Sequence, residues 1–102
     1  MISLEQIQAV VNQIAEKFHP DRIILFGSYA YGKATEDSDV DLLVIMPIDG
    51  SAVDQICRIR RFIQKSFPLD LLVKTPEEIE WRYEGYDPLV RHALDQGRTL
   101  YG

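Results

Sequence analysis

Two aspartates stand two residues apart in the most apolar stretch of the chain, Ser38 to Met46 (SDVDLLVIM). This stretch is typical of a β-strand, in which alternate side chains leave the same face, so Asp39 and Asp41 share one face and Val40 points to the other. Two like charges on a strand that otherwise buries apolar side chains repel each other and lose hydration, which favours a bound cation. Mg²⁺ is the expected ion, because it binds one or two carboxylates and completes its shell with water and phosphate oxygens. A pair of solvated acids at the start of a strand is the alternative.

A third acid, Asp70, is enclosed by leucines in Leu69 to Val73 (LDLLV), which is typical of another short strand. An isolated aspartate in such a place is more often a turn or capping residue. A helical connection precedes this strand, however, and such crossovers favour parallel neighbours whose starting ends meet at one edge of the sheet. The three carboxylates are therefore expected to converge at that edge.

Gly27 and Ser28 follow a short β-branched apolar run, Arg22 to Phe26, which predicts a buried strand that enters a tight turn. The glycine lets the backbone approach a ligand closely, and the serine can cap a short helical turn or donate to a phosphate oxygen. The short connection to the strand of Asp39 suits antiparallel pairing, which brings this turn to the edge where the acids lie. The sequence thus predicts a phosphate site beside a metal site.

Helix caps, proline stops and apolar periodicity predict the elements that position these residues. The chain is expected to be one α/β (α+β) domain over residues 1–102, with a small mixed sheet flanked by helices in the order αβαβαβαα. On one helix the apolar spacing predicts a face lined by Val53, Ile56, Cys57, Arg60, Ile63 and Phe67, and the cysteine is expected to be an inert core residue. The expected helices are Ser3 to about Lys17, a short turn after Ser28, Ala52 to about Ser66, one that starts at Pro76 and Pro88 to about Gln96, with Arg98 to Tyr101 as a candidate edge strand.

Composition restricts the functional classes. The 102 residues are 46% hydrophobic and 26% charged, as in ordinary soluble domains. Sixteen acidic against 11 basic residues give a net charge of −5, the wrong sign for a surface that binds nucleic-acid phosphates, so no direct nucleic-acid binding is expected.

The single cysteine excludes an internal disulfide and a cysteine-based zinc site, and His19 and His92 are expected to be capping or surface residues. Without a leader or about 18 consecutive apolar residues, no membrane association is expected and the cytoplasm is the expected location.

The segment LFGSYAYGKATEDSDVDLLV carries Gly-Ser, ten intervening residues and then Asp-x-Asp directly after a predicted strand. This combination resembles the nucleotidyltransferase fold of the DNA polymerase β superfamily, and in particular the minimal nucleotidyltransferases. The resemblance covers essentially the whole chain, including the closing ALDQGRTLYG. By resemblance, the residues that bind nucleotide phosphates are Gly27 and Ser28, and the catalytic residues, which hold two Mg²⁺ ions, are Asp39, Asp41 and Asp70.

The same resemblance implies a donor and a partner. ATP is the donor, and the partner of minimal nucleotidyltransferases is a small HEPN-domain protein, often an RNase toxin. In such toxin–antitoxin pairs the nucleotidyltransferase is the antitoxin, and for some members it transfers AMP from ATP to a toxin tyrosine. Because 102 residues leave no room for a second domain, the acceptor is expected to be presented by a partner or by a homodimer.

Two other functions stay open. Many relatives have Arg immediately before the glycine that is Gly32 here, whereas this chain has Tyr31, so a phosphate-facing cation is missing. That difference favours a catalytically weak or inactive antitoxin that neutralises its partner by binding and occlusion. Transfer to a small molecule such as an aminoglycoside is the third hypothesis, although the antibiotic-modifying members resemble this core with another domain attached.

Overall fold

Four strands form one mixed sheet in the order β3-β2-β1-β4. The computed structural model describes residues 1–102. Strand β2 pairs antiparallel with β1 and parallel with β3, as predicted, and β4 pairs antiparallel with β1 as the edge strand that follows the predicted helices. No helix combines the length and the apolar character needed to cross a membrane. The elements are α1 (Leu4–Phe18), β1 (Arg22–Phe26), α2 (Ser28–Tyr31), β2 (Val40–Ile45), α3 (Ala52–Phe62), β3 (Leu69–Lys74), α4 (Pro76–Glu84), α5 (Pro88–Gln96) and β4 (Arg98–Tyr101).

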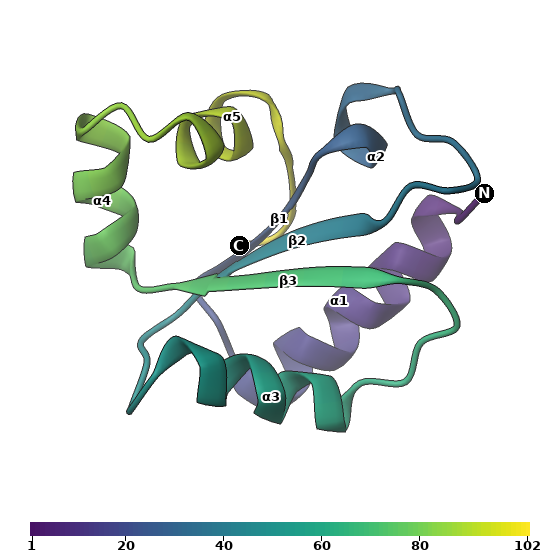
Figure 1. Cartoon of the computed structure of the whole chain (residues 1–102). Helices are drawn as coiled ribbons and strands as arrows, with labels where there is room; N and C mark the ends of the chain where they lie inside the picture. The colour runs from purple at the N-terminus through teal and green to yellow at the C-terminus, as the bar shows by residue number, and fades with distance from the viewer.

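Helices cover both faces of the sheet, with α1 and α3 on one side and α4 and α5 on the other (Figure 1). Alternate residues of β2 enter the two cores: Leu42 and Val44 pack toward α1 and α3, whereas Leu43 and Ile45 pack toward α4 and α5. Burial on both faces explains why residues 42–45 of this strand form an unbroken apolar run. Since side chains alternate, the acid at position 41 lies on the same face as Leu43, which is the face of α4 and α5.

Helix α3 differs from its prediction in both length and orientation. It ends at Phe62 rather than near Ser66, and its buried residues are Gln55 and Ile59. The predicted face was wrong in part: Val53 is 68% exposed and Cys57 is exposed, whereas Ile56 packs partly buried against the core and Ile63 and Phe67 are buried. The cause is a polar residue in the buried stripe, which breaks the apolar pattern on which the prediction relied.

Gln55 is tolerated in that stripe because both ends of its amide have partners. Its Nε2 donates to the sulfur of Met46 at 3.6 Å, and its Oε1 accepts a hydrogen bond of 2.9 Å from Arg58. A buried polar group with partners avoids most of the desolvation penalty that an orphaned one incurs.

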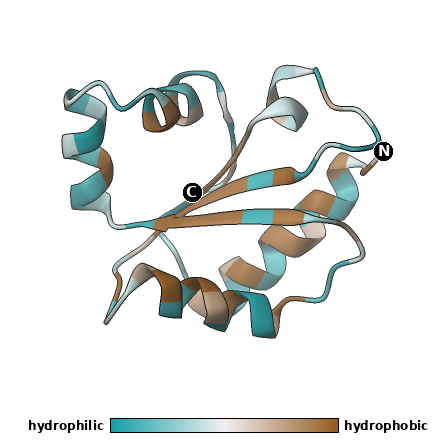
Figure 2. Ribbon diagram, viewed as in Figure 1, coloured by the Kyte–Doolittle hydropathy of each residue, from teal (hydrophilic) through white to brown (hydrophobic).

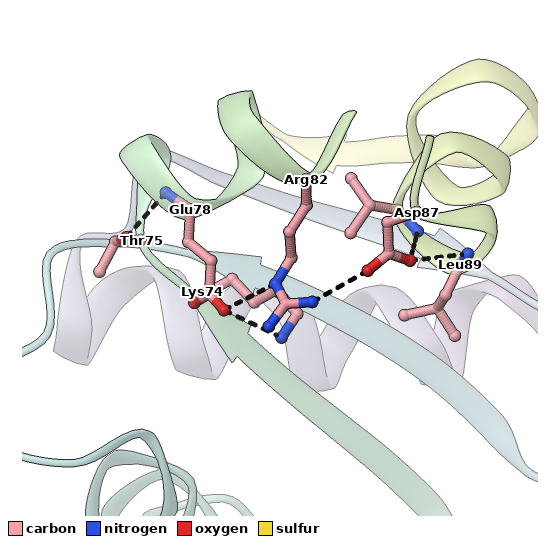
Figure 3. A network of polar contacts seen from close by, with 7 residues as sticks. Lys74, Thr75, Glu78, Arg82, Asp87 and Leu89 are labelled. Carbon is pink, nitrogen blue, oxygen red and sulfur yellow. Dashed lines mark hydrogen bonds and ion pairs between the residues drawn. The ribbon is translucent and has the colours of Figure 1, made fainter. Parts of the chain in front are cut away.

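A hydrogen-bonded network fixes the start of α5 against α4 and the end of β3 (Figure 3). Glu78 pairs with Lys74 at 3.6 Å and with Arg82 at 2.7 Å, and the hydrogen bond from Arg82 holds the pKa of Glu78 below its ordinary value. The same guanidinium reaches Asp87 at 3.0 Å, and Asp87 caps α5 by accepting from the backbone N–H of Leu89. The N-terminus of α5 is therefore held in one place on the sheet.

The observed face of α3 gives a paired stability prediction. Replacing Ile59, which is fully buried, by Ala is expected to lower the free energy of unfolding by about 2–5 kcal/mol, because it removes buried methyl groups and leaves a cavity. The control Val53→Ala is expected to change it by less than about 0.5 kcal/mol, because that side chain is in water. Urea unfolding of both variants measures the difference, and equal losses would contradict the observed orientation of α3.

Candidate active site

The predicted acids lie where β2 and β3 begin, and two of them are direct neighbours across the sheet. The parallel register pairs Asp41 with Asp70. Figure 2 shows adjoining hydrophilic bands on these two otherwise apolar strands. The side chains of Asp41 and Asp70 are close enough to share a hydrogen bond, whereas Asp39 is exposed just before β2 and acts on Asp41 through its charge. The structure therefore brings two of the three acids into contact and leaves the third at the rim.

Burial and like charges make Asp41 a weaker acid than usual. Desolvation is the largest cause, followed by the charge and hydrogen bond of Asp70 and then the charge of Asp39, and together they raise the pKa of Asp41 to about 6. Asp41 is therefore ionised at neutral pH, but burial and the negative charges of Asp70 and Asp39 destabilise its ionised form.

A divalent cation fits these carboxylates, because its charge relieves their repulsion and their oxygens are the ligands that Mg²⁺ prefers. No three His, Cys, Asp or Glu side chains are arranged closely enough to hold a metal ion by themselves. Asp41 and Asp70 are the pair that such an ion would bridge first, and its remaining ligands would come from water and phosphate oxygens.

The turn after β1 approaches this acid pair through Gly27. Phe26 pairs with Asp41 across the sheet, and a Cβ placed on Gly27 would overlap Oδ2 of Asp41. The glycine adopts φ 74° and ψ −161°, a conformation that is essentially restricted to glycine. It precedes Ser28, the first residue of α2, so the predicted Gly-Ser turn and the predicted acids do lie at one edge of the sheet.

Sequence reasoning missed the side of the site that α5 supplies. A pocket beside Gly27 is also bounded by α5, and the ring of His92 packs edge-on against Tyr31 with the centroids 5.7 Å apart. His92 was expected to be a capping or surface residue. It is exposed, but no spacing pattern links a residue so late in the chain to the Gly-Ser turn, and only the tertiary packing shows the proximity.

Comparison with known proteins defines the class of the fold. The model of the nucleotidyltransferase domain family matches residues 7–98. A crystal structure of a putative nucleotidyltransferase from Sulfolobus solfataricus superposes with a TM-score of 0.62 and 25% identity, over 76% of this chain and 71% of that one. The fold is that of a nucleotidyltransferase.

Two archaeal relatives are similar in sequence. The chain is 32% identical over 101 residues to a protein of Methanocaldococcus jannaschii named "Putative protein adenylyltransferase MJ0604", covering 93% of this chain and 94% of that protein. It is 44% identical over 48 residues to "Protein adenylyltransferase MntA" of Thermococcus cleftensis, covering 43% of this chain and 48% of the relative. The chain belongs to the nucleotidyltransferase domain family.

The contact between Gly27 and Asp41 predicts an unequal response of two glycines. Gly27→Ala is expected to lower the free energy of unfolding by about 3 kcal/mol or more, because it combines a forbidden backbone conformation with an overlap at Asp41. Gly32→Ala is the control: Gly32 also has a positive φ, of 75°, but a Cβ there meets nothing within 4 Å, so a loss of only about 1–2 kcal/mol is expected. Thermal and urea unfolding measure both, and a larger loss at Gly32 would contradict the close approach.

The raised pKa of Asp41 predicts an inverted pH dependence. The folded chain holds a proton on Asp41 up to about pH 6, whereas the unfolded chain releases it near pH 3.8, so this group loses stability as the pH rises from about 4 to 6. Relative to Asp41→Asn, the wild type is expected to become less stable over that range by an amount on the order of 1 kcal/mol, after allowance for the solvent exposure of Asp41. Urea unfolding from pH 4 to 7.5 measures this difference, and a constant difference would show that Asp41 titrates normally.

Proposed function

We propose that this protein is an Mg²⁺-dependent adenylyltransferase that moves AMP from ATP to a hydroxyl group, a tyrosine in the first instance, of a partner HEPN-domain toxin. In this role it is the antitoxin of a toxin–antitoxin pair. The observation that carries the proposal is the Asp41–Asp70 pair, in parallel register at the edge where Gly27 turns toward Asp41. The names of two similar proteins, "Putative protein adenylyltransferase MJ0604" and "Protein adenylyltransferase MntA", support transfer to a protein rather than to a small molecule.

The partner is the part of the proposal that depends on the resemblance to minimal nucleotidyltransferases. The carboxylates lie at the end of the sheet, and Asp39 and Asp70 are exposed, so an acceptor held by another protein could approach them. A hydroxyl group on the surface of a partner protein could therefore reach these exposed carboxylates.

In the proposed reaction the acceptor hydroxyl oxygen bonds to the α-phosphorus of ATP. The bond from that phosphorus to the oxygen that bridges the α- and β-phosphates breaks, pyrophosphate leaves with its electron pair, and the hydroxyl proton passes to a carboxylate of the Asp41–Asp70 pair. Gly27 and Ser28 would hold the phosphates through close backbone approach and the serine hydroxyl. Bound Mg²⁺ would supply positive charge at the phosphates. Positioning and charge neutralisation then provide most of the acceleration, so no histidine is required as acid or base.

The proposal predicts loss of transfer without loss of fold in Asp39→Asn with Asp41→Asn. Incubation with ATP, Mg²⁺ and the proposed HEPN-domain partner is expected to add an adenylyl group to the partner with the wild type, and at least about 1,000-fold more slowly with the double variant, by analogy with the loss of a main electrostatic group in other active sites. Intact-mass spectrometry measures the transfer.

Asp37→Asn is the matched control, because Asp37 is an exposed acid in the same loop and outside the acid pair. It is expected to transfer as fast as the wild type. Undiminished transfer by the double variant would overturn the assigned roles of Asp39 and Asp41, and no transfer by the wild type would overturn the enzymatic proposal.

Neutralisation by occlusion is the second candidate, favoured by Tyr31 in place of the arginine that many relatives carry. Coexpression in cells separates the two. If the Asp39/Asp41 double variant still suppresses the toxicity of the partner as well as the wild type does, binding alone is sufficient. If protection is lost while the complex still forms, adenylylation is the protective step.

A further inference from the structure

A pocket of about 430 Å³ opens beside the Gly-Ser turn, between α2 and the first half of α5. Its volume lies in the range of roughly 300–1,000 Å³ that small-molecule sites have. It shares Gly27 with the carboxylate site, so one bound molecule could touch both. The residues that line it are Phe26, Gly27, Tyr31, Pro88, Leu89 and His92.

The walls of this pocket suit a flat, uncharged ring better than a phosphate chain. Three of the lining residues, Phe26, Tyr31 and His92, carry rings, and Leu89 adds aliphatic surface that is 43% exposed. No lysine or arginine lines the pocket, so a polyphosphate would find no permanent positive charge there. Aromatic and aliphatic surfaces of this kind bind nucleobases by stacking and apolar contact.

One residue that lines the pocket, Tyr31, has a hydroxyl without a hydrogen-bond partner. The hydroxyl of Tyr31 is buried and forms no hydrogen bond within the chain. Buried polar atoms in native proteins nearly always have a partner, so an orphan beside a pocket points to a ligand that supplies one. Tyr29, on the same short helix, differs in this respect, because its hydroxyl accepts a hydrogen bond of 3.2 Å from the backbone N–H of Ile2.

We propose that this α2–α5 pocket binds the nucleobase of the donor nucleotide and that the Tyr31 hydroxyl hydrogen-bonds to the base. The inference rests on the proposed function and adds the residues that recognise the nucleoside. With the phosphates at Gly27 and Ser28, the base lies on the surface that the packed rings of Tyr31 and His92 form together with Leu89. The Arg82–Asp87 ion pair and the cap at Leu89 hold the α5 part of that surface in place (Figure 3).

The first experiment compares the two tyrosines of α2. Tyr31→Phe is expected to weaken binding of ATP in the presence of Mg²⁺ about fivefold, because it removes one hydrogen bond to the base. The same variant is expected to have an unchanged or higher Tm without nucleotide, because it removes an unsatisfied buried hydroxyl. Tyr29→Phe is expected to show the reverse: unchanged ATP affinity and a slightly lower Tm. Calorimetric titration and thermal unfolding measure the two quantities.

The second experiment separates the base from the phosphates. Leu89→Ala and His92→Ala are each expected to weaken ATP binding roughly tenfold and to leave binding of inorganic tripolyphosphate with Mg²⁺ unchanged. Leu4→Ala is the control for Leu89→Ala, because Leu4 on α1 is similarly exposed, at 41%, and lies outside the pocket.

The outcomes distinguish this inference from the proposed function. If the wild type binds neither ATP nor tripolyphosphate, both the proposed function and the nucleobase site are wrong. If ATP binds and the pocket variants do not weaken it, only the nucleobase site is wrong. If the variants weaken tripolyphosphate as much as ATP, the pocket holds phosphates, which also overturns the inference. A Tyr31→Phe variant that loses stability without losing ATP affinity would show that the hydroxyl is structural.

Discussion

The pairing of β2 on both of its edges is the constraint on which the rest of the structure depends. On one edge β2 pairs antiparallel with β1, and on the other it pairs parallel with β3. The side chains on its two faces pack into two separate hydrophobic cores. Five of its six side chains, all aliphatic, are at most 3% exposed. Each such side chain contributes about 1.5–3 kcal/mol of burial free energy, and a shift of register by one residue would exchange the side chains that the two cores receive and move Asp41 to the opposite face. The position of Asp41 along the strand is therefore set by this apolar register.

That register has an electrostatic consequence. The same alignment that pairs Leu42 with Leu71 and Val44 with Val73 also pairs Asp41 with Asp70, so two acids are held together by the burial of their neighbours. Without a cation this contact is unfavourable, as the raised pKa of Asp41 indicates. A fold that maintains such a contact trades some stability for a site that is already assembled when phosphates arrive.

The features that could be predicted from the sequence were those that depend on local signals. Strand β1, the short turn of α2 and the start of α5 at Pro88 follow from β-branched runs, glycine and proline, and the structure has them where they were expected. The predicted face of α3 was wrong at Val53 and Cys57, because Gln55 occupies a buried position that its hydrogen bonds to Met46 and Arg58 make acceptable. The α5 wall of the pocket could not be found at all, because the proximity of His92 to Tyr31 arises from the packing of two elements far apart in the chain.

Asp70 lies on an edge strand, so the acid pair forms only when β3 is paired with β2. Strand β3 is paired on one side only, and its link to β2 spans the whole crossover through α3, whereas β1 and β2 are joined by the shorter connection that contains α2. Local opening of a protein favours such edges, and contacts that are distant in sequence form late in folding. The acid pair is therefore complete only when the sheet is complete, and detachment of β3 would dismantle it while the β1–β2 hairpin persists. Docking of β3 on β2 and binding at the acid pair are therefore coupled equilibria. A ligand that contacts both Asp41 and Asp70 would also stabilise the pairing of β3 with β2.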